Sequence, residues 1–212
     1  MNMFKLIGLT TMSAISSNQG FSQTLTFRKT TGFEVTLMEF KIEKTETGYR
    51  LEDDQKLDQT RATILWQKQD QKSNTSVKAK RIGDAIEING TFQGAAVEKR
   101  YPTNGLAWYQ AMGYNLITFV MSQKPKTTFV TIREDNLDLM EMEAKRESVG
   151  TVKVNGIETK AVKVKANLTG FMSMFWSASF WFSIDEEPML MRYESVEGGP
   201  GTPLTIHEFV RQ

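Results

Sequence analysis

Apolar and polar residues alternate along most of the chain, which is the pattern of β-strands that bury one face. In residues 35–44, Met38, Phe40 and Ile42 fall on one side and charged residues fall on the other. The same alternation recurs in later segments, at 49–57, 61–69, 86–92, 128–134, 137–145, 152–154, 162–168, 175–184, 189–196 and 204–210. Turn dipeptides separate them, and Asn155-Gly156 is the strongest short hairpin signal. The pattern predicts a mainly-β fold of about ten antiparallel strands, arranged as a sandwich or barrel.

Residues 106–121 interrupt the alternation, because their apolar positions fit a helix as well as a strand. Trp108, Met112, Leu116 and Phe119 would line one face of a helix that Asn104 could cap. We therefore expect one helix from about residue 105 to residue 119. Its apolar side chains surround most of its circumference, so it has to be covered on several sides. A helix packed on or in a curved sheet meets that requirement.

The first residues read as a targeting segment. Lys5 precedes a short apolar stretch at 6–15, and Gly20-Phe21-Ser22 resembles a cleavage site with small residues. This predicts a signal peptide at 1–22 and a single all-β domain at 23–212, exported to the periplasm or secreted. The alternative is an irregular N-terminal tail on a cytosolic protein. No later window holds the ~18 apolar residues of a membrane helix, so we expect no integral membrane segment.

The composition excludes several classes of function. Lys and Arg total 26 and Asp and Glu total 25, for a net charge of +1 at pH 7. This balance gives no basic stripe for nucleic acid, so no nucleic-acid partner is expected. There are no cysteines and His207 is the one histidine, which leaves no material for disulfides, thiolate metal sites or multi-histidine metal sites. We expect no metal and no cofactor.

Large aromatic residues gather near the C-terminus, flanked by methionines. On a strand, Trp176, Phe180, Phe182 and Ile184 would share one face, with Trp181 on the opposite face. These rings either form the domain core or line a cavity for an apolar ligand, and both interpretations remain open. The residues that would line such a ligand site are Trp108, Met112, Phe175, Trp176, Phe180, Trp181, Phe182, Met189 and Met191.

Catalytic motifs are weakly represented. The sequence has no nucleophile elbow, P-loop or dinucleotide fingerprint. Carboxylates on the predicted strands are typical of a solvated face, and His207 fits a surface or rim position. The pairs Met140/Met142, Met172/Met174 and Met189/Met191 offer soft ligands for Cu(I), but core methionines explain them better. The sequence therefore favours a protein that is not an enzyme.

The second half of the chain resembles an uncharacterised family of exported bacterial all-β proteins. The residues that carry the resemblance are Glu147-Ser148-Val149-Gly150, Val154-Asn155-Gly156, Ala161-Val162-Lys163-Val164, Phe175-Trp176, Phe180-Trp181-Phe182-Ser183 and Glu187-Pro188-Met189-Leu190-Met191-Arg192-Tyr193. The resemblance spans roughly residues 100–196 and implies an open, curved sheet around a helix. This shape is analogous to the half barrels of periplasmic lipoprotein carriers. The analogy concerns architecture only and identifies no site residue in this chain.

Two functional hypotheses follow. The first is a non-catalytic envelope protein whose curved sheet binds an apolar or amphipathic ligand, such as lipid or a lipidated chain. The second is a structural or adaptor domain that binds another envelope protein. The adaptor hypothesis predicts a filled core and an exposed apolar patch on the outside of the sheet.

Overall fold

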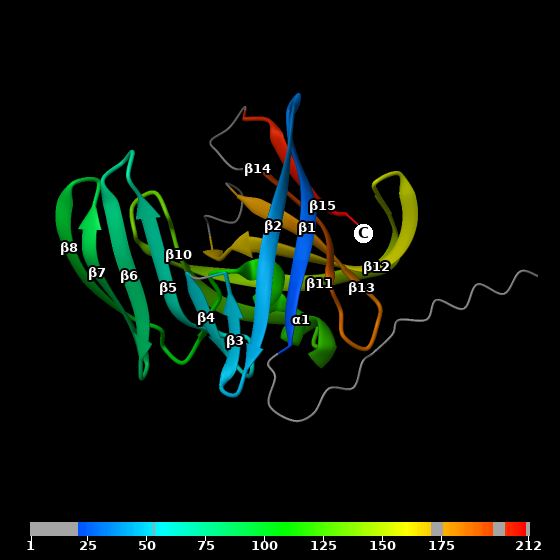
Figure 1. Cartoon of the computed structure of the whole chain (residues 1–212). Coiled ribbons are helices and arrows are strands. Elements are labelled where there is room, and N and C mark those ends of the chain that lie inside the picture. Colours follow the sequence, from blue (N-terminus) through cyan, green and yellow to red (C-terminus); the bar gives the residue numbers. More distant parts are fainter. Residues whose placement is uncertain (1–20, 53, 171–175, 197–201, 211–212) are drawn as a thin grey trace, which may run out of the picture.

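The alternating segments form one continuous sheet that curves around a single helix (Figure 1). The computed structural model describes residues 21–52, 54–170, 176–196 and 202–210. Within these ranges, 15 strands pair in the order β8-β7-β6-β5-β4-β3-β2-β1-β15-β14-β13-β12-β11-β10-β9. Neighbours are antiparallel except β9 and β10, which are parallel. The ladder leaves β8 and β9 as edges, which confirms the mainly-β open half barrel with one helix.

The elements have the following bounds. The first part of the chain contains β1 (Ser22–Thr31), β2 (Glu34–Thr45), β3 (Gly48–Leu51), β4 (Gln55–Asp58), β5 (Thr63–Asp70), β6 (Thr75–Ile82), β7 (Ala85–Phe92) and β8 (Ala95–Pro102). The second part contains β9 (Ala107–Trp108), α1 (Met112–Ser122), β10 (Lys126–Ile132), β11 (Leu139–Val154), β12 (Ile157–Leu168), β13 (Ser177–Ser183), β14 (Leu190–Val196) and β15 (Leu204–Phe209).

The predicted hairpin at Asn155-Gly156 is confirmed. Asn155 (φ 49°) and Gly156 (φ 81°) both adopt the left-handed conformation that such a two-residue turn requires. The turn joins the 16 residues of β11 to the 12 residues of β12. The prediction of about ten strands was lower than the 15 observed. β1, β6 and β8 carry many polar residues and were not recognised, the predicted strand at 49–57 is divided into β3 and β4, and β9 was assigned to the helix.

The helix is confirmed, but the predicted start at about residue 105 is wrong. α1 begins at Met112, and Asn104 (φ 53°) and Gly105 (φ 75°) form a left-handed turn that cannot begin a helix. Trp108 lies on β9, where it pairs with Val130 of β10. Trp108 and Met112 therefore do not share a helix face. The apolar spacing around Trp108 also fits a helix, but these residues pair with β10 instead.

One face of the sheet carries the apolar core, and we call it the inner face. The face that carries Arg28, Lys165 and Trp181 is the outer face. α1 lies on the inner side of the curve (Figure 1) and buries Leu116, Phe119 and its neighbours against β10, β11, β12 and β13. A second buried cluster lies among β1, β2, β3 and β4. A third cluster packs β5, β6 and β7 against β10.

The two ends of the sheet meet through side chains rather than through a hydrogen-bonded ladder. Trp66 of β5 and Trp108 of β9 belong to the same buried cluster. At the rim, Lys99 of β8 donates to Asp138 (3.0 Å), and Lys68 of β5 pairs with Glu134 (2.9 Å). Within the described residues, the two ends are therefore joined by packing, by ion pairs and by hydrogen bonds to side chains, such as that from the backbone amide of Gln110 to the hydroxyl of Thr63 (3.0 Å).

The predicted signal peptide falls almost wholly outside the described residues, since the description begins at Phe21. Among the described residues, no helix has the length and apolar character needed to cross a membrane.

Candidate functional site

Two of the β13 rings that were predicted to line a ligand site, Phe180 and Phe182, lie in the core. Phe180 and Phe182 are buried on the inner face, with their rings stacked 6.3 Å apart. Phe180 also contacts Tyr193 of β14, at 5.0 Å between ring centroids. Their faces are therefore occupied by other side chains of the chain itself.

The remaining predicted residues are distributed over several environments. Trp108 is fully buried in the cluster that joins the sheet ends. Met112 and Trp176 pack at the edge of the helix cluster, Met191 is buried on β14, and Met189 is half-buried just before that strand. Phe175 lies outside the described residues, as does the pair Met172/Met174.

Trp181 lies on the outer face, as predicted from the alternation. The ammonium of Lys163 lies 5.5 Å from its ring centroid, and the guanidinium of Arg192 lies 5.9 Å from it. Cations at these distances are attracted to the face of an indole ring. The expectation that Ile184 shares the buried face of Phe182 was wrong. The strand ends at Ser183, whose backbone bonds to Met189, and Ile184 is 53% exposed in the turn that follows.

An apolar groove of about 350 Å³ lies beside the tip of the β11–β12 hairpin, and we call it the hairpin groove. Its volume falls in the range of small-molecule sites. Most of its lining is apolar, and the residues are Arg28, Leu37, Val154, Asn155, Ile157, Thr159, Met191, Phe209 and Val210. Of the eight predicted site residues that lie within the described ranges, Met191 alone lines it.

A network of charged residues supports one side of the hairpin groove. Arg28 donates to Glu208 (2.5 Å), and Arg192 donates to the same carboxylate (2.8 Å). The hairpin tip is fastened to this network, because the amide of Asn155 donates to Glu208 (3.2 Å) and its side chain donates to the Phe209 carbonyl (2.6 Å). The groove is therefore bounded by a hairpin held in place by hydrogen bonds, and Arg28 retains a side chain that is 40% exposed.

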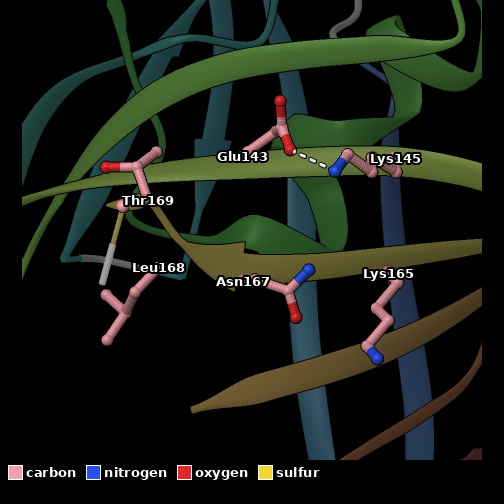
Figure 2. A pocket seen from close by; sticks show the side chains of 7 residues that line it. Glu143, Lys145, Lys165, Asn167, Leu168 and Thr169 are labelled. Carbon is pink, nitrogen blue, oxygen red and sulfur yellow. Dashed lines mark ion pairs between the residues drawn. The ribbon is translucent and has the colours of Figure 1, made fainter. Parts of the chain in front are cut away.

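A second pocket, of about 420 Å³, is polar and lies over β11 and β12 on the outer face (Figure 2). It is lined by Glu143, Lys145, Lys165, Asn167, Leu168, Thr169 and Gly170. Glu143 accepts from Lys145 (2.8 Å) and from Lys126 (3.3 Å). The hydrogen bond from Lys145 lowers the pKa of Glu143 below its ordinary 4.5; partial burial opposes this, and the bond from Lys126 adds to the lowering.

The part of the chain described here shows no candidate metal centre. That part contains no group of three or more His, Asp or Glu residues placed to hold a metal ion. His207 is half-buried on β15, with its ring 5.2 Å from that of Tyr193. Met142 is buried in the helix cluster, with Met140 packed against the same cluster.

Sequence reasoning missed the residues that form both pockets. Leu37 was interpreted as part of a strand and Ile157 was not singled out, yet they are 70% and 61% exposed. A signal was present for the polar pocket, since lysines recur at alternate positions of β12, but the register that brings Lys126, Lys145 and Lys165 together could not be read from the sequence.

Comparison with known proteins gives a fold and no activity. Neither protein-family profiles nor curated proteins match the chain. Among solved structures, it is similar to a β-barrel-like protein of the domain of unknown function DUF1849 from Brucella abortus. That similarity has a TM-score of 0.51 at 8% identity and covers 91% of this chain and 81% of that chain. The two proteins share a fold.

This likeness agrees with the resemblance to uncharacterised all-β proteins inferred from the second half of the sequence. At 8% identity it extends to the fold alone. A hypothetical lipoprotein, YmcC, from Escherichia coli also matches, at 11% identity over 91% of this chain and 84% of that chain. The TM-score of this second match is 0.37.

Proposed function

We propose that this chain is an exported, non-catalytic envelope protein that binds an apolar or amphipathic ligand, such as lipid or a lipidated chain. The hairpin groove is the observation that carries the proposal, since it combines apolar walls with a volume of about 350 Å³. The residues at 1–22, with the sequence features of a signal peptide, support export.

The groove suits a ligand with both an apolar and an anionic part. Leu37 and Ile157 would lose exposed apolar surface when such a ligand binds, and burying an aliphatic side chain is worth about 1.5–3 kcal/mol. Arg28 lies at the same groove with its side chain 40% exposed. An anionic end group placed there would meet a cation already held in position by Glu208.

The ligand site would thus lie beside the hairpin tip rather than at the rings of β13. Phe180 and Phe182 would act as the core that holds β12, β13 and α1 together, and Met191 would contribute to the groove. The other predicted residues within the described ranges do not line the hairpin groove.

Uptake of a fluorescent long-chain fatty acid by delipidated protein tests this function. We expect Ile157→Asn to weaken binding by about tenfold, which corresponds to about 1.4 kcal/mol. Val149→Asn is the matched control, because Val149 is 64% exposed on the same hairpin and lines neither pocket. The proposal is wrong if the unaltered protein takes up no fatty acid, or if both variants lose the same affinity.

The adaptor function remains the second candidate because β2 and the turn before it carry an exposed apolar row. Phe33, Val35 and Leu37 follow each other at alternate positions and are 107%, 58% and 70% exposed. An apolar row of this kind fits contact with another protein. Co-purification of one stoichiometric envelope protein that is lost in Phe33→Ser, with fatty-acid uptake absent, would favour the adaptor.

A further inference from the structure

Three lysines lie side by side across three neighbouring strands of the outer face. Lys126 of β10 is the cross-strand partner of Lys145 of β11, and Lys145 is the partner of Lys165 of β12. We call these three residues the lysine row. Like charges placed directly opposite each other destabilise a sheet, so the fold gains nothing from this arrangement.

The charges of the lysine row are only partly compensated. Glu143 is shared between Lys126 and Lys145, and no carboxylate partner is recorded for Lys165 within the described residues. Three ammonium groups and one carboxylate leave a local excess of positive charge, in a chain whose total net charge is only +1. Glu141 lies on the same face of β11 but does not line the pocket.

The pocket beside the lysine row has room for a ligand. It has a volume of about 420 Å³ and includes Lys145, Lys165 and the side-chain amide of Asn167. Figure 2 shows Lys145 turned toward Glu143, while Asn167 and Lys165 come from the neighbouring strand and Lys165 points away from that pair. An ammonium on a flexible stem can reorient toward an incoming anion at little cost.

We propose that the lysine row and Asn167 bind the phosphate group of an anionic ligand. Lysine ammonium groups bind phosphate as point charges, and the Asn167 amide adds a neutral donor. The ligand is either free phosphate or the headgroup of an anionic lipid, since both present the same group. The site is separate from the hairpin groove and does not depend on the function proposed for that groove.

Two binding measurements on the intact protein distinguish the sources. Inorganic phosphate is titrated while the NMR signals of residues 165–170 are followed, and co-sedimentation is measured with phosphatidylcholine vesicles with and without an equal part of phosphatidylglycerol. We expect Lys165→Gln to weaken binding by about fivefold, the effect of removing one lysine from such a contact. Added salt weakens the binding further.

Lys163→Gln is the matched control. Lys163 lies two positions away on the same face of β12, is paired with Glu147 (2.8 Å) and does not line the pocket. If phosphate and the anionic vesicles both bind, and both bind more weakly to Lys165→Gln but not to Lys163→Gln, the site is assigned to a lipid headgroup. If phosphate alone binds, with the same difference between the two variants, the site is assigned to free phosphate. Equal losses in the two variants would show diffuse attraction and overturn the proposal, as would no binding in either assay.

Discussion

At the scale of single residues, Asp58 shows how one carboxylate organises a turn that reaches the helix. Its oxygens accept from the backbone amides of Thr60 (2.9 Å) and Ala62 (3.0 Å) and from the guanidinium of Arg81 (2.5 Å). This turn carries Arg61, whose guanidinium lies beside the contacting rings of Tyr49 and Tyr114, at 4.8 and 5.2 Å from their centroids. Because Tyr114 belongs to α1, this turn fastens the helix to the sheet.

The ionised form of Asp58 stabilises the fold, and this gives a pH-dependent prediction. Burial alone would raise its pKa, but the hydrogen bonds from Thr60, Arg81 and Ala62 outweigh burial, so its pKa lies below the ordinary 3.8. The stabilisation is therefore complete above pH 3.8 and is lost as the pH falls through the lowered value.

We expect Asp58→Asn to lower the free energy of unfolding by about 1–3 kcal/mol at neutral pH. The difference from the unaltered protein should shrink as the pH is lowered through the range in which Asp58 takes up its proton. Urea unfolding at several pH values measures this, with the exposed Asp185→Asn as control. A difference that stays constant down to acid pH would contradict the role given to the carboxylate.

At the scale of elements, α1 has a backbone cap at its C-terminus only, where the amide of Gln123 donates to Val120 (3.3 Å), and contacts with the sheet hold both ends. Its N-cap is Ala111, which provides no side-chain hydrogen bond, and at its other end Arg146 donates to the carbonyl of Val120. Gly113 lies so near the first residue of β14 that a Cβ built on it would be 2.8 Å from Cδ2 of Leu190. Close packing against the sheet therefore explains a glycine in the first turn.

A double-mutant cycle tests this packing. Gly113→Ala alone should be nearly neutral, since a gain of about 1 kcal/mol in helix propensity is offset by displacement of Leu190. In the Leu190→Ala background the same substitution should stabilise the protein by about 1 kcal/mol, because its new methyl group meets no obstacle. If thermal unfolding shows the same effect of Gly113→Ala in both backgrounds, the contact does not constrain the helix.

The alternation of residues predicted the elements well where one face is apolar and the other is charged. The inward set of β12, with Val162, Val164 and Ala166, is buried as expected.

The segment around Trp108 was misassigned because its β-pairing depends on distant partners. The side chain of Gln110 bonds to both the amide and the carbonyl of Ile132, 22 residues away, and so extends the pairing of β9 past its last residue. Such contacts are tertiary and leave no local pattern.

At the scale of the whole molecule, one buried tryptophan lies where the two ends of the sheet pack together. Trp108 is fully buried between the two ends of the open sheet, and its indole donates to Gln110 (3.1 Å). We expect Trp108→Ala to lower the free energy of unfolding by about 3–5 kcal/mol. Trp181→Ala, on the half-exposed outer face, should cost clearly less. Equal losses in urea unfolding would show that the sheet ends do not depend on this contact.

The candidate site was less predictable than the fold, because both pockets arise from register and from the bending of a hairpin. Asn155-Gly156 predicted the turn, but nothing near it in sequence indicated that Asn155 would bond to Glu208 and Phe209 and so form one wall of a groove. Dense aromatic residues pointed instead to Phe180 and Phe182, which the fold uses in its core. Apolar composition alone does not distinguish a core from a binding surface.

Native mass spectrometry of the protein purified from its own host tests the central claim most directly. The account predicts a species heavier than the bare polypeptide by the mass of one amphipathic molecule, and it predicts that this species is depleted in Ile157→Asn and retained in Val149→Asn. A spectrum that contains only the bare polypeptide would contradict a ligand site beside the hairpin tip. An adduct that is as abundant in Ile157→Asn as in the unaltered protein would contradict it too.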